Sequence, residues 1–353
     1  MTEPLNVADY ERLAEERLDA GVAGYVAGGA ADEHTLRDNV DAFRRRRLRP
    51  RVLVDVGAVR TETQVLGTPV SLPVLVAPTA FQRLVHPDGE VACAQGAAAA
   101  GTVFCLSTLS SVRPAELAAV VPDAARWFQL YWSRDREFTR QLLAEAQESG
   151  YSALALTVDL PFAGRRERDL RAAFRLPADL PLPNLSPALD PPQDTGTGLG
   201  PVVDQTLTWR ELEWLAGASS LPLVIKGLLT REDAALAVEH GAAAVVVSNH
   251  GGRQLDGVPA ALDALAEVVE AVAGRAEVLM DGGVRRGTDV LVALALGARA
   301  VLVGRAALYG LAVGGAAGVQ HVLELLRAEV QLGLALLGCV SPAEVSPDHV
   351  TAP

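Results

Sequence analysis

The stretch AAAVVVSNHGGRQLDG, residues 242–257, contains the change of character that decides the fold. Its first six residues are small or β-branched, as in a strand that is buried on both faces. The run ends at Ser248, and His250, two glycines and Arg253 follow at once. A buried strand that leads directly into reactive side chains is typical of a parallel α/β sheet, in which functional groups gather at the carboxyl ends of the strands.

The same pattern recurs along the chain. Short apolar runs alternate with Ala/Leu/Glu-rich segments of helical periodicity, such as residues 231–240 and 288–296, which end at Gly241 and Gly297. Eight strand and helix units predict a closed (β/α)₈ barrel, the TIM barrel. A doubly wound open sheet is the alternative, but no G-x-G-x-x-G turn follows the first strand. The predicted strands are residues 74–77, 103–106, 127–130, 153–158, 223–225, 244–247, 278–280 and 300–303.

The spacing of these units also predicts the domain organisation. We expect residues 1–353 to form one domain, because barrels of this kind reach that length. Residues 1–70 precede the first strand as a helical and extended segment that could cap one end of the barrel. Residues 161–205, after the fourth strand, are rich in proline and then in glycine. Loops of this length inside a compact domain are often functional lids, and we expect a lid here.

The charge and the cysteine content exclude several classes of partner and binding site. The chain carries 31 basic and 43 acidic side chains, a net charge of −12, so nucleic acid and anionic membranes are poor partners. Its three cysteines are far apart and form neither a disulfide framework nor a metal-binding pattern, so we expect no metal site. There is no signal-peptide pattern and no uninterrupted apolar span, and we therefore expect a cytoplasmic protein.

Polar side chains follow most of the predicted strands, and those after strands five, seven and eight are the most informative. Lys226, after strand five, is the single lysine among 31 basic residues, so this position has kept a compact ammonium group. The sequences DGGVRRG (residues 281–287) and GR (304–305) follow strands seven and eight. Exposed backbone N–H groups and arginines suit a phosphate there, where such barrels commonly bind one. The alternative is two tight turns with solvated arginines.

Eight motifs together resemble one family. The chain is similar, from about Tyr10 to Ser341, to the FMN-dependent 2-hydroxy acid oxidases and dehydrogenases, which include glycolate, lactate and 4-hydroxymandelate oxidases. The family has a (β/α)₈ barrel, which agrees with the strand count. The motifs that carry the resemblance are LPVLVAPTA, WFQLY, LTVD, GRRERD, VIKG, SNHGGRQLDG, DGGVRRGTDVLVALALGA and VLVGR.

The resemblance implies a catalytic set. His250 would be the active-site base, and Asp159 would hydrogen-bond it and favour its protonated form once it has accepted a proton. Whether the base removes the α-proton or the hydroxyl proton remains open. Two arginines would bind the substrate carboxylate as bidentate donors, and two tyrosines would hydrogen-bond the substrate. These substrate-binding residues would be Arg166, Arg253, Tyr25 and Tyr131, with Tyr131 and Lys226 also in the catalytic set.

The resemblance also implies FMN as the cofactor. Lys226 would lie near the N1 and C2-carbonyl edge of the flavin, where negative charge develops on reduction. The backbone of Pro78, Thr79 and Ala80 would line the ring. The polar contacts would be Ser107, Gln129, Thr157 and Ser248, and the ribityl chain and phosphate would be held by Asp281, Gly283, Arg285, Gly304 and Arg305.

Two positions differ from plant glycolate oxidase-like members of the family. Leu109 stands where those members have tryptophan, and Ala163 where they have a bulkier aliphatic residue. We therefore expect oxidation of an (S)-2-hydroxy acid with a medium-to-large or aromatic side chain, with oxygen reoxidising the flavin. The alternatives are a dehydrogenase with another acceptor, an isomerase on the same barrel and a non-catalytic flavin- or phosphate-binding protein. The resemblance further implies a homo-oligomer, a tetramer.

Overall fold

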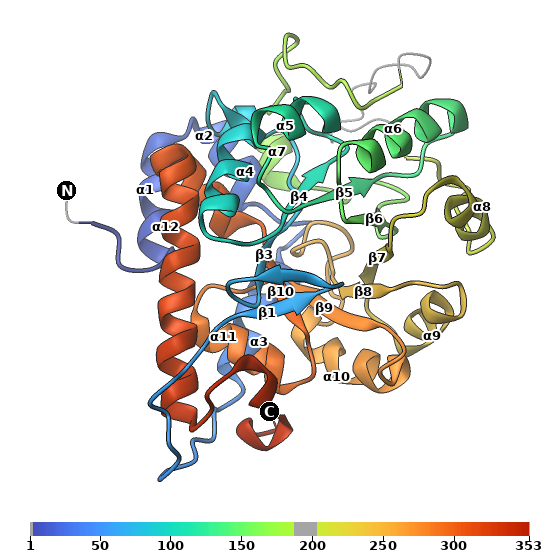
Figure 1. The fold of residues 1–353 in the computed structure, drawn as a ribbon. Coiled ribbons are helices and arrows are strands. Elements are labelled where there is room, and N and C mark those ends of the chain that lie inside the picture. The colour runs from blue at the N-terminus through green and yellow to red at the C-terminus, as the bar shows by residue number, and fades with distance from the viewer. Residues whose placement is uncertain (1–2, 187–202, 353) are drawn as a thin grey trace.

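A closed barrel of eight parallel strands forms the centre of the molecule (Figure 1). The structure is a computed structural model, and it describes residues 3–186 and 203–352. Each strand pairs with the next, and β10 pairs with β3, so the predicted barrel is confirmed and the open-sheet alternative is wrong. The barrel strands are β3 (Val74–Val76), β4 (Phe104–Ser107), β5 (Arg126–Leu130), β6 (Ala153–Thr157), β7 (Leu223–Leu228), β8 (Ala244–Val247), β9 (Glu277–Asp281) and β10 (Ala300–Val303).

The predicted strand ends match closely except in β7, which runs to Leu228 and not to Ile225. The apolar run is interrupted by Lys226 and Gly227, and for that reason the sequence pattern ends too early. The pairing with β8 shifts register between Lys226 and Leu228, and Gly227 has a φ of +113°. Lys226 therefore lies within β7 itself, in the wall of the barrel, and only 4% of its surface is exposed.

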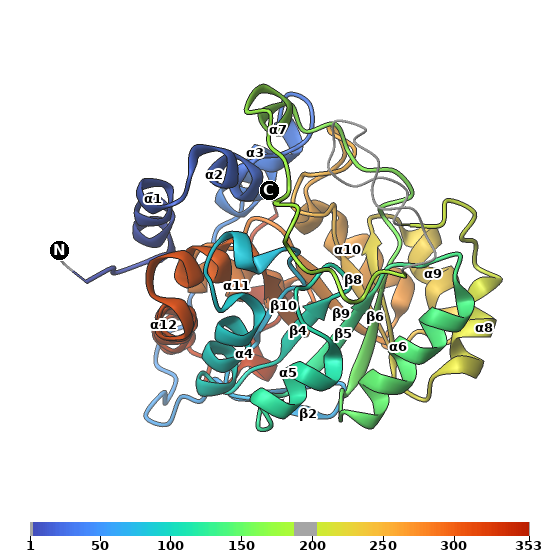
Figure 2. The ribbon, with the colours of Figure 1, turned by 90° about the horizontal axis from the view of Figure 1, so that it is seen from above.

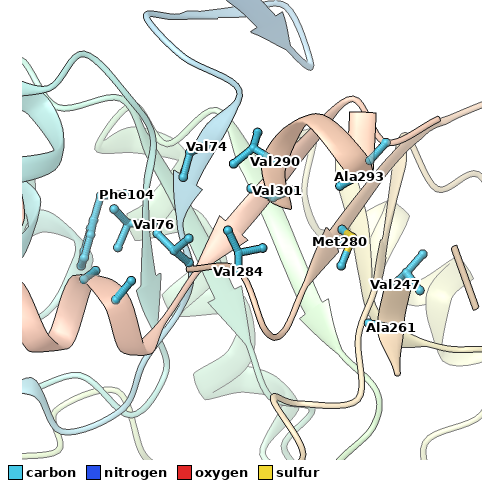
Figure 3. Close-up of a cluster of buried hydrophobic side chains, with 14 of the residues drawn as sticks. Val74, Val76, Phe104, Val247, Ala261, Met280, Val284, Val290, Ala293 and Val301 are labelled. Carbon is cyan, nitrogen blue, oxygen red and sulfur yellow. The ribbon is translucent and has the colours of Figure 1, made fainter. Parts of the chain in front are cut away.

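Side chains of the barrel strands alternate between the barrel interior and the surrounding helices. Leu75, Cys105 and Trp127 point inward and are fully buried with their counterparts from the other strands. Figure 3 shows the outer layer, where Val301 and Met280 lie against the helices that cover the sheet. The helices that cover the barrel are α4 (Gly89–Ala99), α5 (Pro114–Val120), α6 (Arg136–Glu148), α8 (Glu211–Ala218), α9 (Arg231–Glu239), α10 (Ala261–Val272), α11 (Gly287–Ala295) and α12 (Arg305–Leu337).

The N-terminal segment reaches both ends of the barrel. A hairpin of β1 (Thr63–Val65) and β2 (Thr68–Val70) closes the amino end, where Val65 and Val70 join the interior cluster. Three helices precede it: α1 (Val7–Arg17), α2 (Ala20–Ala27) and α3 (His34–Arg44). Of these, α1 and α2 pack beside α12 (Figure 2), and α2 places Tyr25 at the carboxyl end of the barrel. The hairpin is an element that the sequence did not predict.

Helix α12 is long and apolar enough, by length and composition, to cross a membrane. However, 61% of its most apolar window is buried inside the protein, where the helix packs against α4 and α1. Its backbone is non-helical at Gly314 and Gly315, so it consists of two helices that meet at a kink.

The described part of segment 161–205 covers one side of the barrel mouth. It contains α7 (Glu167–Arg171) and four leucines that pack over a buried cluster of Phe81, Leu109, Tyr131 and Leu160. The rest of the predicted lid, residues 187–202, lies outside the described residues. The leucines are Leu176, Leu180, Leu182 and Leu185.

Candidate active site

Most of the predicted site residues surround one cavity at the carboxyl ends of the strands. The cavity contains about 1020 Å³ of space, part of it open to solvent. A pocket of this kind is the usual location of the active site in a (β/α)₈ barrel. The predicted residues that line it are Tyr25, Pro78, Thr79, Ala80, Ser107, Leu109, Tyr131, Arg166, Lys226, His250, Arg253, Asp281, Gly283, Arg285, Gly304 and Arg305.

Four predicted residues lie behind this lining. Two of them contact lining residues directly. Asp159 accepts a hydrogen bond from His250, and Ser248 accepts one from Lys226. Gln129 accepts a hydrogen bond from the Ser107 hydroxyl at 3.1 Å. Thr157 is buried and pairs with Lys226 in the barrel register.

Ala163 does not line the cavity, and the prediction that it faces the substrate together with Leu109 is wrong. It lies in a neighbouring cavity, on the other side of Asp159. The side chain of Gln254 explains this position, because its Nε2 donates to the carbonyl groups of Asp159 and Phe162, at 2.8 and 2.9 Å. These bonds hold the segment after β6, which contains Ala163, against the loop that follows β8.

His250 and Asp159 form a base and carboxylate pair. The Nδ1 of His250 lies 2.9 Å from Oδ1 of Asp159. An ionised carboxylate can only accept, so Nδ1 carries the proton and Nε2 of a neutral imidazole is free to accept another. Burial lowers the pKa of His250, although the Asp159 carboxylate opposes this effect. Burial alone would raise the pKa of Asp159, but His250 and Lys226 outweigh it and keep that pKa low.

Lys226 is held by two partners. Its ammonium group lies 3.0 Å from Oδ2 of Asp281 and donates to the Ser248 hydroxyl at 3.0 Å. Burial acts to lower the pKa of Lys226, but the carboxylates of Asp281 and Asp159 outweigh it and raise the pKa above its ordinary value. The group therefore remains a fixed positive charge in the cavity wall.

Two guanidinium groups face the cavity near His250. Arg166 is 3% exposed, and its Nε has no hydrogen-bond partner among the described residues. Burial, followed by the charge of Arg253, lowers the pKa of Arg166 to about 10. Arg253 donates through Nη1 to the carbonyl groups of Tyr25 and Gly28, at 2.6 and 2.8 Å, and its guanidinium lies 4.8 Å from the centre of the Tyr25 ring. A buried cation beside a partly buried one favours an anion between them.

Tyr131 supplies a hydroxyl to the same region. It is 7% exposed, and burial raises its pKa, so the hydroxyl stays protonated and can donate. Tyr25 reaches the cavity from α2, where its ring stacks on Phe174 with the ring centres 5.0 Å apart.

The predicted phosphate end of the cavity is built from glycines and arginines. Gly283 has a φ of +82°, and a Cβ there would lie 2.0 Å from the carbonyl oxygen of Asn39, so no other residue fits. Arg305 donates to the carbonyl groups of Val26, Gly251 and Gly28, at 2.8 to 2.9 Å. Burial and the charge of Arg253 lower the pKa of Arg305 to about 9. This crowding of cations would be relieved by an anionic phosphate.

The chemistry of the lining fits FMN. Two polar atoms behind or in the wall, Nε2 of Gln129 and Oδ1 of Asp281, are buried with no hydrogen-bond partner among the described residues. One is a donor and the other an acceptor, and a flavin with its ribityl chain offers partners for both. The cations at one end suit its phosphate, and Lys226 suits the edge of the ring that gains negative charge.

Sequence reasoning missed ten residues of the lining, all of them glycine or apolar, and Leu160 and Gly251 are among them. Gly251 could have been found from the pair of glycines after His250. It has a φ of +64°, and a Cβ there would lie 2.8 Å from Nη1 of Arg305. Leu160 gave no signal, because an apolar residue after a strand is indistinguishable from core.

Comparisons with known proteins agree with this site. The family model described as FMN-dependent dehydrogenase matches residues 14–352. The L-lactate oxidase of Nostoc sp. is 52% identical over 349 residues, covering 96% of each chain. Glycolate oxidase 3 of Arabidopsis thaliana is 48% identical over 351 residues, which is 98% of this chain and 95% of the relative.

Solved structures show the same likeness. Mandelate oxidase with (S)-2-phenylpropionate superimposes with a TM-score of 0.90 at 42% identity, covering 99% of this chain and 98% of that one. A mutant of the active chimera of (S)-mandelate dehydrogenase gives a TM-score of 0.92 at 40% identity, covering 99% of both chains. A likeness of this extent in both sequence and fold shows that the chain belongs to the FMN-dependent dehydrogenase family, and that its cofactor is FMN.

Proposed function

We propose that the protein oxidises an (S)-2-hydroxy acid to the 2-oxo acid and that oxygen reoxidises its flavin. One observation carries the proposal: His250, which is hydrogen-bonded to Asp159, lines the same cavity as Arg166, Arg253 and Lys226. A 2-hydroxy acid needs a clamp for its carboxylate and a base for the proton that it loses. The names of the relatives, L-lactate oxidase, glycolate oxidase and mandelate oxidase, support the same class of substrate.

The residues of this chain would divide the work. Arg166 and Arg253 would hold the carboxylate, which fixes the position of the α-carbon. Nε2 of His250 would accept the proton that the substrate loses, and Asp159 would stabilise the resulting imidazolium. When bound, FMN supplies the acceptor for the two electrons.

Anaerobic mixing of the holoenzyme with a series of 2-hydroxy acids tests the proposal. The absorbance of the oxidised flavin is expected to disappear. It should return rapidly when oxygen is admitted, and hydrogen peroxide should form at the same time. Bleaching with slow reoxidation by oxygen would indicate a dehydrogenase with another acceptor. An isomerase or a non-catalytic flavin-binding protein would not be bleached by any acid in the series.

We propose that the preferred substrate has a medium-to-large apolar or aromatic side chain. Leu109 and Leu160 line the cavity, and the leucines of segment 161–186 extend this apolar wall outward. Ala163 lines the neighbouring cavity, so the preference rests on Leu109 and this wall. An additional 80 to 100 Å² of buried apolar surface, at roughly 25 cal/mol per Å², contributes about 2 kcal/mol, or about thirtyfold in kcat/KM when it acts in the transition state.

Values of kcat/KM for glycolate, lactate, 2-hydroxyoctanoate and mandelate, measured with one acceptor, test this preference. The larger acids should exceed glycolate by about thirtyfold. The variant Leu109→Trp should remove most of this advantage, because the larger ring fills space in the cavity. Ala163→Leu is the control and should leave the preference unchanged. A wild-type preference for glycolate would contradict the proposal.

The activity is expected to fall on the acid side of neutrality. His250 must be neutral to accept a proton, and burial lowers its pKa from its ordinary value of 6.5. The pH profile of kcat/KM, which reports the free enzyme, should therefore be flat at neutral pH and fall only below pH 6.5. Asp159→Asn removes the carboxylate that opposes this shift, so its acid limb should move to lower pH and its plateau should be lower. An acid limb centred above neutral pH in the wild type would contradict the assignment of His250.

A further inference from the structure

The loop that carries His250 has a backbone that needs support. His250, Gly251 and Gly252 follow one another with φ angles of +57°, +64° and +75°. Glycine adopts such angles freely, but a histidine does so only when its surroundings fix it there. The hydrogen bond from the backbone N–H of His250 to the Ser248 hydroxyl is one fixed point, and the others come from α3.

A pair of buried asparagines joins α3 to this loop. Asn39 on α3 and Asn249, the neighbour of His250, are 2% and 4% exposed. The Nδ2 of each donates to the Oδ1 of the other at 2.8 Å. Oδ1 of Asn249 also accepts the N–H of Gly252 at 3.0 Å, so the pair closes around the left-handed turn.

Two of these amide atoms each make a second hydrogen bond, to the segment that follows the loop. Nδ2 of Asn249 donates to the carbonyl of Pro259 at 3.1 Å, and Oδ1 of Asn39 accepts the N–H of Ala261 at 3.2 Å. A buried amide that loses its partner leaves polar atoms without hydrogen bonds, which favours movement of the loop.

A second connection fixes the far end of the loop to the start of α3. The Asp256 carboxylate accepts the backbone N–H groups of His34 and Thr35, at 3.1 and 2.7 Å, and the N–H of Gly257 donates to the Thr35 hydroxyl at 2.9 Å. Gly283, on the predicted phosphate side, packs against the Asn39 backbone. Helix α3 thus contacts both the base loop and the loop that carries Gly283.

We propose that Asn39 is a positioning residue for His250. Through Asn249 it holds residues 248–257 in the turn that points the imidazole into the cavity, and it touches neither substrate nor flavin itself. The role in turnover depends on the proposed function of His250 as base. Small displacements of a reacting group can reduce a rate by about 10²-fold, so Asn39→Ala should slow flavin reduction by about 10 to 100-fold.

Three variants of the holoenzyme test the proposal. Asn39→Ala removes both bonds to Asn249. Asn39→Asp keeps the shape and can still accept from Asn249, but it places a carboxylate oxygen opposite Oδ1 of Asn249 with no proton between them, so it should also slow flavin reduction. Arg45→Gln is the control, because Arg45 also joins α3 to α10, through Asp263 at 2.5 Å, but it does not contact the loop.

Hydrogen exchange and transient kinetics are the two measurements. In Asn39→Ala, peptides that cover residues 249–257 should exchange about tenfold faster, while peptides from β4 and β5 keep wild-type exchange. The reduction rate per bound flavin should fall with little change in the apparent dissociation constant of the substrate. In Arg45→Gln both quantities should remain at wild-type values.

The outcomes separate this proposal from the proposed function. Unchanged local exchange and an unchanged reduction rate in Asn39→Ala would overturn it, as would uniform faster exchange throughout the protein or failure of both Asn39 variants to fold. A wild-type enzyme that no 2-hydroxy acid reduces would overturn the proposed function instead, and the exchange experiment would still test the connection from α3 to the loop.

Discussion

Replacing His250 by glutamine is expected to preserve FMN binding and to slow reduction of the flavin by about 10² to 10⁴-fold. Glutamine can still donate a hydrogen bond to Asp159 but has no basic nitrogen to accept the substrate proton. The cations that suit the cofactor lie outside the loop that carries His250 and keep their contacts: Lys226 on β7, Arg285 after β9 and Arg305 at the start of α12. The loss should therefore appear in the reductive step and not in flavin content.

Stopped-flow reduction under anaerobic conditions, expressed per bound flavin, measures this effect. The control is His240→Gln, because His240 stacks on Trp209 with ring centres 5.6 Å apart and does not line the cavity. It should reduce at the wild-type rate. Reduction of His250→Gln within a fewfold of wild type would show that another group is the base.

The barrel could be predicted from the sequence because its strands are continuous apolar runs. A strand that is buried on both faces requires apolar side chains at nearly every position. The sequence also predicted that Lys226, His250 and Arg253 come together, since the carboxyl ends of all eight strands meet at one rim. Neither inference requires knowledge of any particular tertiary contact.

The features that the sequence did not predict depend on such contacts. Strands β1 and β2 have only three residues each, which is too short for a periodic pattern. Ala163 lies in a segment that hydrogen bonds from Gln254, about 90 residues further along the chain, hold in place. Asn39 is one polar residue in an ordinary helical pattern, and only its partner Asn249 gives it a role.

Arg305 was predicted only in part from the sequence. The sequence placed it correctly at the cavity, but it also donates to the carbonyl groups of Val26 and Gly28 at the carboxyl end of α2. Arg253 donates to Gly28 as well. Cations at the carboxyl end of a helix are favourable, so the same arginines that face the cavity also hold the helix that carries Tyr25.

Removal of the positive charge at Lys226 is expected to make the flavin harder to reduce. In Lys226→Met the side chain keeps most of its length but loses the charge that would stabilise the negative charge of the reduced flavin. Two unit charges about 4 Å apart interact by about 4 kcal/mol at an effective dielectric constant of about 20, so a loss of up to about 10³-fold in the reduction rate is reasonable. The midpoint potential should fall in parallel.

The Lys226→Met variant also leaves the Asp281 carboxylate without its buried cation, and this second effect must be separated from the first. Breaking a buried ion pair by removal of one partner costs about 3 to 5 kcal/mol of stability, so the melting temperature should fall too. Asp281→Asn disrupts the same pair but keeps the lysine charge, and Lys226→Arg keeps the charge in a bulkier and more diffuse group. If the charge beside the flavin is what matters, the midpoint potential should fall in Lys226→Met, recover in part in Lys226→Arg and not fall in Asp281→Asn. A potential that is unchanged in Lys226→Met, or lowered equally in Asp281→Asn, would show that Lys226 serves the ion pair and not the flavin.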